Sequence, residues 1–316
     1  MVQRLSRREA GLAVLFHRVG DSHQYWDEGK YPCLGLRFFE AQLRHLIKRY
    51  RVVAASELME AVRSRRRGER FPVALTFDDD SPSHVRHAAP ILQRLGVPAT
   101  FFLSGASLDG SGSFWWQRLE RAMERGAISR EELSEMVPAA SGVPAGRREM
   151  LQIADDIELM APELLRDLLD ELGRRAGPDP EDAVLDTAGI RKLVAAGFEV
   201  GFHTLRHLNL STLDSAELGL AISEGRDRLA GAIDRELTLI AYPGGKWNPH
   251  VLEAARSAGY LRGFTTDPKA VLPDSDPLCL GRVDSGWCTT LGQFELNLAR
   301  ALRRDDGVRF GEATVA

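Results

Sequence analysis

One stretch of the sequence decides the fold: FPVALTFDDD, residues 71–80. Its first seven residues are almost all apolar and have the length of a buried β-strand, which ends in Asp78, Asp79 and Asp80. Three adjacent carboxylates raise each other's proton affinity unless a cation or hydrogen-bond donors offset their charge. Alone, the pattern is also typical of a solvated turn or a helix N-terminus, because Ser-Pro follows and aspartate caps helices well.

A second strand-like run, GFEVGF at 197–202, is followed at once by HTLRH at 203–207. Where such a segment turns helically, His203 and His207 point the same way and offer two neutral imidazoles to a divalent ion. With one aspartate they make a set that leaves coordination positions open for water and substrate, as a catalytic metal requires. The alternative is an ordinary solvated or hydrogen-bonded pair of histidines.

A third run, Leu237 to Tyr242, is again strand-like and breaks into Pro243, Gly244 and Gly245. This sequence permits a tight turn whose exposed backbone N–H groups could stabilise an oxyanion, although a plain turn would look the same. In a barrel of parallel strands, the residues that follow the strands gather at one mouth. Together the three stretches predict a metal-dependent hydrolase.

The chain resembles the polysaccharide deacetylase family, the NodB-homology domain of carbohydrate esterase family 4, from Leu12 to about Gly286. The family signature Thr-Phe-Asp-Asp-Gly appears as TFDDD at 76–80, and His-(Ser/Thr)-x-x-His appears as HTLRH at 203–207. GVPATFFL at 96–103 matches the strand after the first signature, and LFHRV at 15–19 matches an opening strand of many members. Four matches in the same order are far more specific than any one motif.

The resemblance implies a site for each step of amide hydrolysis. Asp78 would be the general base, and the metal would be held by Asp79, His203 and His207. Zinc is the expected ion, with cobalt, nickel or manganese as alternatives. The segment Tyr242, Pro243 and Gly244 would contact the substrate and the oxyanion. The backbone N–H of Gly244, in the place of a family tyrosine, would help to hold the oxyanion.

The chain departs from the family pattern at three points. Asp80 replaces the usual glycine, and Ala241 stands where many members have an arginine that orients the base, so Arg282 is expected to serve instead. The late histidine that acts as general acid is not evident, since no histidine follows Cys288. His17, at the end of the opening strand, is the expected proton donor by position; the alternative is a core histidine bonded to backbone.

The alternation of strands and helices predicts an α/β fold: a distorted, incomplete (β/α) barrel of the NodB-homology type with a helical insertion. Residues 1–316 would form one domain, 105–186 a helical insertion subdomain within it, and 304–316 a disordered tail. In the insertion, Trp115 and Trp116 could stack on a sugar ring or pack against the barrel. The expected strands are 12–17, 51–54, 72–77, 98–103, 197–202, 237–242, 260–265 and 280–284, with helical stretches at 38–50, 153–172 and 213–233.

Composition limits the remaining choices. The 41 basic and 45 acidic residues give a net charge of −4, so no global attraction to nucleic acid or anionic membranes is expected. No run reaches membrane-spanning length, and the apolar stretch 11–16 is too short for a signal-peptide core. Three cysteines are too few for a disulfide framework, so a cytoplasmic protein is expected.

The predicted function is removal of an N-acetyl group from an N-acetylated sugar or glycoconjugate precursor by a metal-dependent hydrolase, with release of acetate. A small or lipid-linked sugar precursor is the expected substrate. Two alternatives remain: a hydrolase of a non-sugar linear or cyclic amide on the same metal site, and a catalytically impaired homologue that binds sugars. The oligomeric state is left open.

Overall fold

The computed structural model describes residues 8–20, 33–108, 113–139, 142–144, 150–160, 162–180 and 183–303. In this part of the chain the main sheet has eight strands in the order β10-β1-β5-β6-β7-β8-β9, with β4 paired to β5. The strands of this sheet pair with one another in parallel. The strands are β1 (Leu12–Phe16), β4 (Arg51–Val53), β5 (Pro72–Asp78), β6 (Thr100–Leu103), β7 (Glu199–Phe202), β8 (Leu239–Ala241), β9 (Arg262–Phe264) and β10 (Val283–Asp284).

The sheet curves into an incomplete barrel, as the sequence predicts. At its open edge, Phe264 of β9 forms an isolated bridge with Leu280, which lies just before β10 in the chain. β5 lies near the middle and is buried along its whole length, which explains its continuous apolar sequence. Because the strands are parallel, their carboxyl ends share one mouth.

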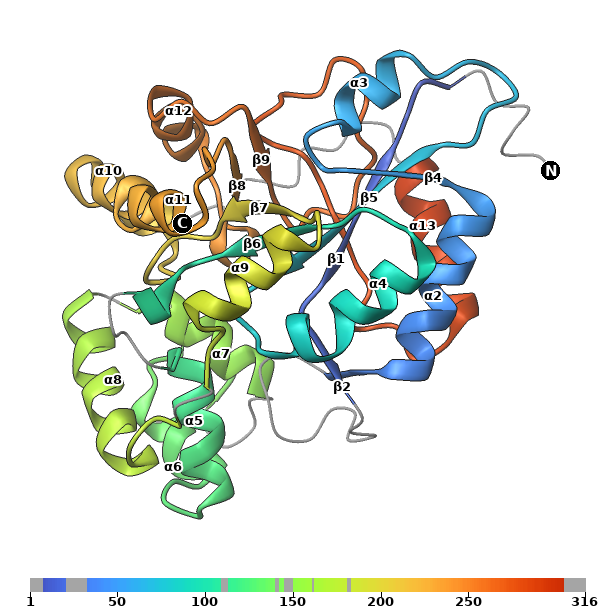
Figure 1. Ribbon diagram of the computed structural model, residues 1–316. Helices are drawn as coiled ribbons and strands as arrows, with labels where there is room; N and C mark the ends of the chain where they lie inside the picture. Colours follow the sequence, from blue (N-terminus) through green and yellow to red (C-terminus); the bar gives the residue numbers. More distant parts are fainter. Residues whose placement is uncertain are drawn as a thin grey trace.

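Helices cover the outside of the barrel (Figure 1). In α2 (Leu36–Arg49), for example, Phe39, Leu43 and Leu46 are buried at spacings of four and three, so one face packs on the sheet. A small second sheet pairs β2 (Arg18–Gly20) with β3 (Cys33–Gly35). The other outer helices are α3 (Leu58–Arg63), α4 (Ala89–Leu95), α9 (Thr187–Ala195), α10 (Ser215–Ser223), α11 (Arg226–Ile233), α12 (Pro249–Ser257) and α13 (Leu291–Arg303).

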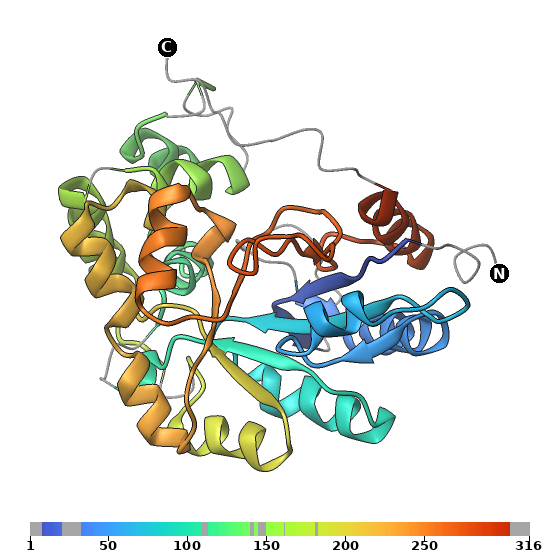
Figure 2. The same ribbon diagram turned by 90° about the horizontal axis from the view of Figure 1, so that it is seen from above.

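The described residues of the 105–186 stretch form four α-helices: α5 (Trp115–Glu124), α6 (Arg130–Met136), α7 (Met150–Glu158) and α8 (Pro162–Ala176). They have a hydrophobic core of their own, which includes Leu119, Leu133, Ile153 and Leu172. Figures 1 and 2 show these green helices grouped at one side of the barrel, away from α2 and α13. We refer to 105–186 as the insertion.

Two expected helical stretches are each broken in the structure. The stretch 213–233 forms α10 and α11: α10 ends at Ser223, Glu224 is extended, and Gly225, with a left-handed φ of 83°, is the N-cap of α11. The stretch 153–172 is likewise shared between α7 and α8. The predicted tail, 304–316, lies outside the described residues. Among those described, no helix combines the length and apolar character needed to cross a bilayer.

Candidate metal centre and active site

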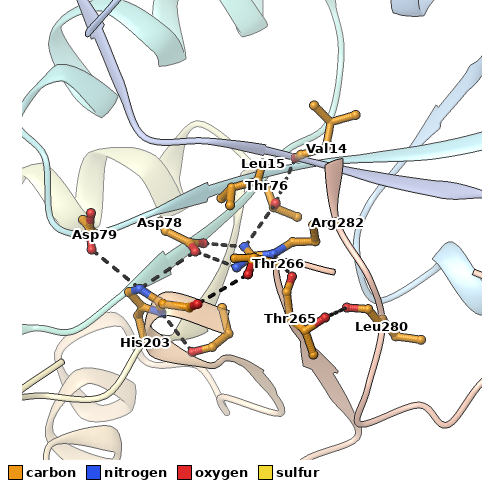
Figure 3. Close-up of polar contacts among 12 residues, drawn as sticks. Val14, Leu15, Thr76, Asp78, Asp79, His203, Thr265, Thr266, Leu280 and Arg282 are labelled. Carbon is orange, nitrogen blue, oxygen red and sulfur yellow. Dashed lines mark hydrogen bonds and ion pairs between the residues drawn. The ribbon is translucent and has the colours of Figure 1, made fainter. Parts of the chain in front are cut away.

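Asp78 is the last residue of β5, and its carboxylate is held by Arg282 (Figure 3). Nη1 of Arg282 donates to Oδ1 of Asp78 at 2.6 Å, and Nη2 donates to Oδ2 at 2.7 Å. Nε of Arg282 donates to the carbonyl of Thr265 at 2.9 Å, which fixes the guanidinium. Both side chains are buried. Burial alone would raise the pKa of Asp78, but the charges of Arg282 and His203 outweigh it and the pKa is lowered.

The turn after β5 is fastened by His84. Asp79 has φ 70°, a left-handed conformation that is unusual for aspartate. Nε2 of His84 lies 3.1 Å from the carbonyl oxygen of Asp78 and 2.9 Å from that of Asp79. Since carbonyls only accept, this nitrogen carries the proton and donates to both. Burial lowers the pKa of His84 to about 4, so the ring is neutral at neutral pH.

The two predicted histidine ligands follow β7. Nδ1 of His203 donates to the carbonyl of Ala241 at 2.9 Å, which leaves the lone pair of Nε2 directed at the site. That Nε2 lies 3.6 Å from Oδ1 of Asp79 and 3.9 Å from Oδ2 of Asp78. Nε2 of His207 lies 3.7 Å from the same Oδ1 of Asp79. Burial lowers the pKa of His203, which favours the neutral, ligating form.

These three residues fit a divalent ion. The ligand atoms of Asp79, His203 and His207 lie within 4.8 Å of one another, and all three residues are buried. Two ligands bound tetrahedrally to zinc at about 2.0–2.1 Å lie roughly 3.4 Å apart, close to the separations found here. Two imidazoles and one carboxylate also leave coordination positions for water and substrate.

A pocket of about 180 Å³ opens beside this centre. Asp78 and His203 form part of its wall, and His17 lies in the same wall, where the sequence predicted a proton donor. The insertion supplies another part of it from α7. The remaining lining residues are Ala154, Asp155, Glu158, Gly244, Thr266, Asp284 and Trp287.

Three acidic residues of this pocket were not predicted. Asp155 and Glu158 come from α7, and only the tertiary placement of the insertion brings them here. Asp284 ends β10, and burial raises its pKa to about 6. The signal that found Asp78, an acid at the end of a strand, could also have found Asp284.

The segment after β8 only partly follows the prediction. Gly244 lines the pocket with φ 58°, inside a short 3₁₀ turn, Pro243–Gly245. Pro243 is buried and has no N–H to donate. Tyr242 is fully buried in the barrel core, where its hydroxyl donates to Leu278 and its backbone N–H donates to Phe264. The prediction that Tyr242 contacts substrate is therefore corrected, because both of its donors are already used.

Trp115 and Trp116 are buried in the core of the insertion, with exposed fractions of 9% and 4%. Neither is among the residues that line the pocket. Of the two alternatives, sugar stacking and packing, this geometry corresponds to packing. The ring of Trp116 also contacts His207, with ring centroids 4.6 Å apart.

Comparisons with known proteins agree on one family. The family model described as polysaccharide deacetylase matches residues 65–136 and 175–263. A Bacillus subtilis (strain 168) protein named "Putative polysaccharide deacetylase YxkH" is 29% identical over 94 residues. That alignment spans 30% of this chain and 34% of the relative, so the chain is matched to only about a third of that protein's length.

Solved structures share the fold at low sequence identity. The Streptococcus pyogenes deacetylase PplD, in complex with acetate, has a TM-score of 0.60 and 16% identity, covering 93% of this chain and 99% of that one. The polysaccharide deacetylase BC0361 from Bacillus cereus has a TM-score of 0.59 and 18% identity, covering 92% and 69%. IcaB from Ammonifex degensii has a TM-score of 0.54 and 20% identity, covering 93% and 98%. With the signature residues gathered at one mouth of an incomplete barrel, the chain belongs to the polysaccharide deacetylase family.

Proposed function

We propose that this protein is a metal-dependent N-deacetylase that acts on an N-acetylated sugar or glycoconjugate and releases acetate. The observation that carries the proposal is the joint position of a buried, arginine-clamped Asp78 and the Asp79, His203 and His207 set beside one pocket. A divalent ion held by that set supplies Lewis-acid chemistry: it polarises a carbonyl and makes a water molecule more acidic.

Asp78 would accept the proton of the attacking water. Its pKa is lowered, so the carboxylate is ionised and ready to accept at neutral pH. The bidentate contact with Arg282 fixes the plane of the carboxylate, the task of the arginine that Ala241 replaces. The water oxygen bonds to the acetyl carbon, and the backbone N–H of Gly244 is our candidate donor to the oxyanion.

The C–N bond breaks only if the nitrogen receives a proton, because an amine leaves poorly as an anion. His17 is our candidate for that role, since it lines the pocket with Asp78. Asp284 lines the same pocket and, with its pKa raised to about 6, holds its own proton in slightly acid solution. A donor on this wall would replace the late histidine that the chain lacks.

We propose zinc as the ion, a sugar precursor as the substrate and the cytoplasm as the location. The impaired alternative is weakened because Arg282 and His17 lie where replacements for the two lost family residues are needed. The non-sugar amide alternative shares the metal set and differs only in substrate.

The test is acetate release from a panel of N-acetyl sugars and non-sugar amides, measured together with metal content by mass spectrometry. One equivalent of metal and acetate release from sugars alone would support the proposal. Metal without turnover would favour the sugar-binding alternative, and turnover of the non-sugar amides alone would favour the other hydrolase.

A further inference from the structure

We propose that Trp116 is a positioning residue for the metal centre: it holds the imidazole of His207, so that the insertion helps to set the affinity for the ion. This inference rests on the proposed metal site. It concerns a residue outside the ligand set and outside the pocket lining.

The ring of His207 packs against aromatic side chains of the insertion. His207 lies in the loop after β7 with φ 49°, a left-handed value that its neighbours must stabilise. Its ring meets Trp116 at a centroid distance of 4.6 Å and an interplanar angle of 67°, a favourable T-shaped contact. Phe114 stacks on Trp116 at 4.6 Å and 8°, and contacts His207 at 6.1 Å. The insertion thus forms an aromatic wall against this ligand.

The two histidine ligands are positioned by different parts of the chain. His203 is oriented by a hydrogen bond to the main chain of Ala241, at the end of β8 in the barrel. His207 lies against Trp116, which is the second residue of α5 and belongs to the insertion core. A change of the Trp116 ring should therefore act on His207 first, and on His203 only through the contact between the two imidazoles, whose centroids lie 4.9 Å apart.

Both ends of the insertion are tied to the turn that carries Asp79. The carboxylate of Asp80 accepts from the N–H of Ser104 at 2.8 Å, its hydroxyl at 2.6 Å and the N–H of Ala106 at 3.0 Å. The backbone carbonyl of Asp80 accepts from the N–H of Leu185, at the other end, at 2.7 Å. The glycine usual at this position has no side chain to make the first three contacts, so Asp80 helps to hold the start of the insertion against the turn that carries Asp79.

The experiment is a Co²⁺ titration of metal-free protein, followed by visible absorption, which reports both affinity and ligand geometry. Trp116→Leu removes the ring, and Trp116→Phe keeps a smaller one. The matched control is Leu172→Ala, in α8 of the same core and fully buried, which creates a cavity without touching the described contacts of His207.

Loss of groups that orient a metal ligand typically weakens binding about 10–100-fold. We expect a loss of that size in Trp116→Leu, with a spectrum shifted toward that of His207→Ala. Trp116→Phe should recover most of the affinity. It still tests the proposal if the leucine variant does not fold. Leu172→Ala should melt at a lower temperature yet bind Co²⁺ within about threefold of wild type.

Two results would overturn the positioning role alone: unchanged affinity and spectrum in the Trp116 variants, or an equal loss in Leu172→Ala. If wild-type protein itself binds no Co²⁺, the metal centre and the proposed function fail with it.

Discussion

Replacing Arg282 by methionine should leave a buried carboxylate without its counter-charge. Asp78 is only 2% exposed, and the change removes two charge-assisted hydrogen bonds of 2.6 and 2.7 Å. Breaking a buried pair in this way costs about 3–5 kcal/mol of unfolding free energy. In the double variant, which combines Arg282→Met with Asp78→Asn, no unpaired charge remains buried. We therefore expect its loss of unfolding free energy to be about 2–3 kcal/mol smaller than the sum of the two single losses.

The loss should depend on pH with a definite sign. In wild type the lowered pKa of Asp78 contributes stability above the unfolded value of about 3.9, and this is lost as pH falls. In Arg282→Met, burial is no longer offset and the pKa of Asp78 rises above that value. The folded variant then holds a proton that the unfolded chain releases, so its stability falls as pH rises. The gap between the two proteins should therefore narrow steadily as pH falls, being smallest in acid well below about pH 4, where both folded proteins hold the proton, and widest at neutral pH.

The assay is urea unfolding of wild type, both single variants and the double variant, at several pH values with a chelator present. Chelation removes any contribution from bound metal to the comparison. A loss that does not change with pH, together with additive single effects, would refute the assignment of Arg282 as the counter-charge of Asp78.

Four further results are expected. Asp78→Asn should lower turnover by about 10²–10⁴-fold with metal still bound, and near-normal rates would exclude the base role. His17→Ala should cut kcat for the N-acetyl substrate far more than for an ester analogue, whose leaving group needs no proton; an unchanged amide/ester ratio would exclude it. Glu158→Gln should raise KM for the full substrate more than for a truncated sugar, because α7 brings this carboxylate to the pocket, and equal effects would argue against a substrate contact. The pKa of His84 is lowered to about 4, so the unfolded chain takes up a proton before the folded protein does, and the unfolding free energy should fall as pH drops below about 6.5. In His84→Gln the unfolding free energy should depend less on pH in that range.

Most strands of the barrel could be predicted because they lie in apolar, β-rich stretches that end at a polar or glycine-rich break. β5 is the clearest case, since the run 72–77 is followed at once by charge. β2 and β3 were missed because neither has an apolar run: β2 is Arg18-Val19-Gly20 and β3 is Cys33-Leu34-Gly35, and their pairing is a tertiary event. The break at Gly225 was missed because glycine within a helical pattern does not always end the helix.

The candidate site also contains residues that the sequence predicts and residues that only the folded chain reveals. Asp78, Asp79, His203 and His207 were predicted to lie together because each lies at or after the end of a strand, and parallel strands bring such positions to one mouth. Residues on the insertion, such as Glu158, carry no such signal, since no local pattern tells which face of α7 meets the barrel. Tyr242 was misplaced because sequence does not reveal that its hydroxyl is used by Leu278 in the core. The contact of Trp116 with His207 likewise exists only in the folded chain.

The central claim is that one ion at Asp79, His203 and His207 serves the removal of acetyl groups. It is tested most directly by titrating zinc into chelated protein and measuring acetate released from N-acetylated sugar oligomers. We predict that activity is lost on chelation, rises linearly with added zinc and reaches a plateau at one equivalent, with no recovery in His203→Ala. Full activity in the chelated protein, or the same recovery in His203→Ala as in wild type, would contradict the account.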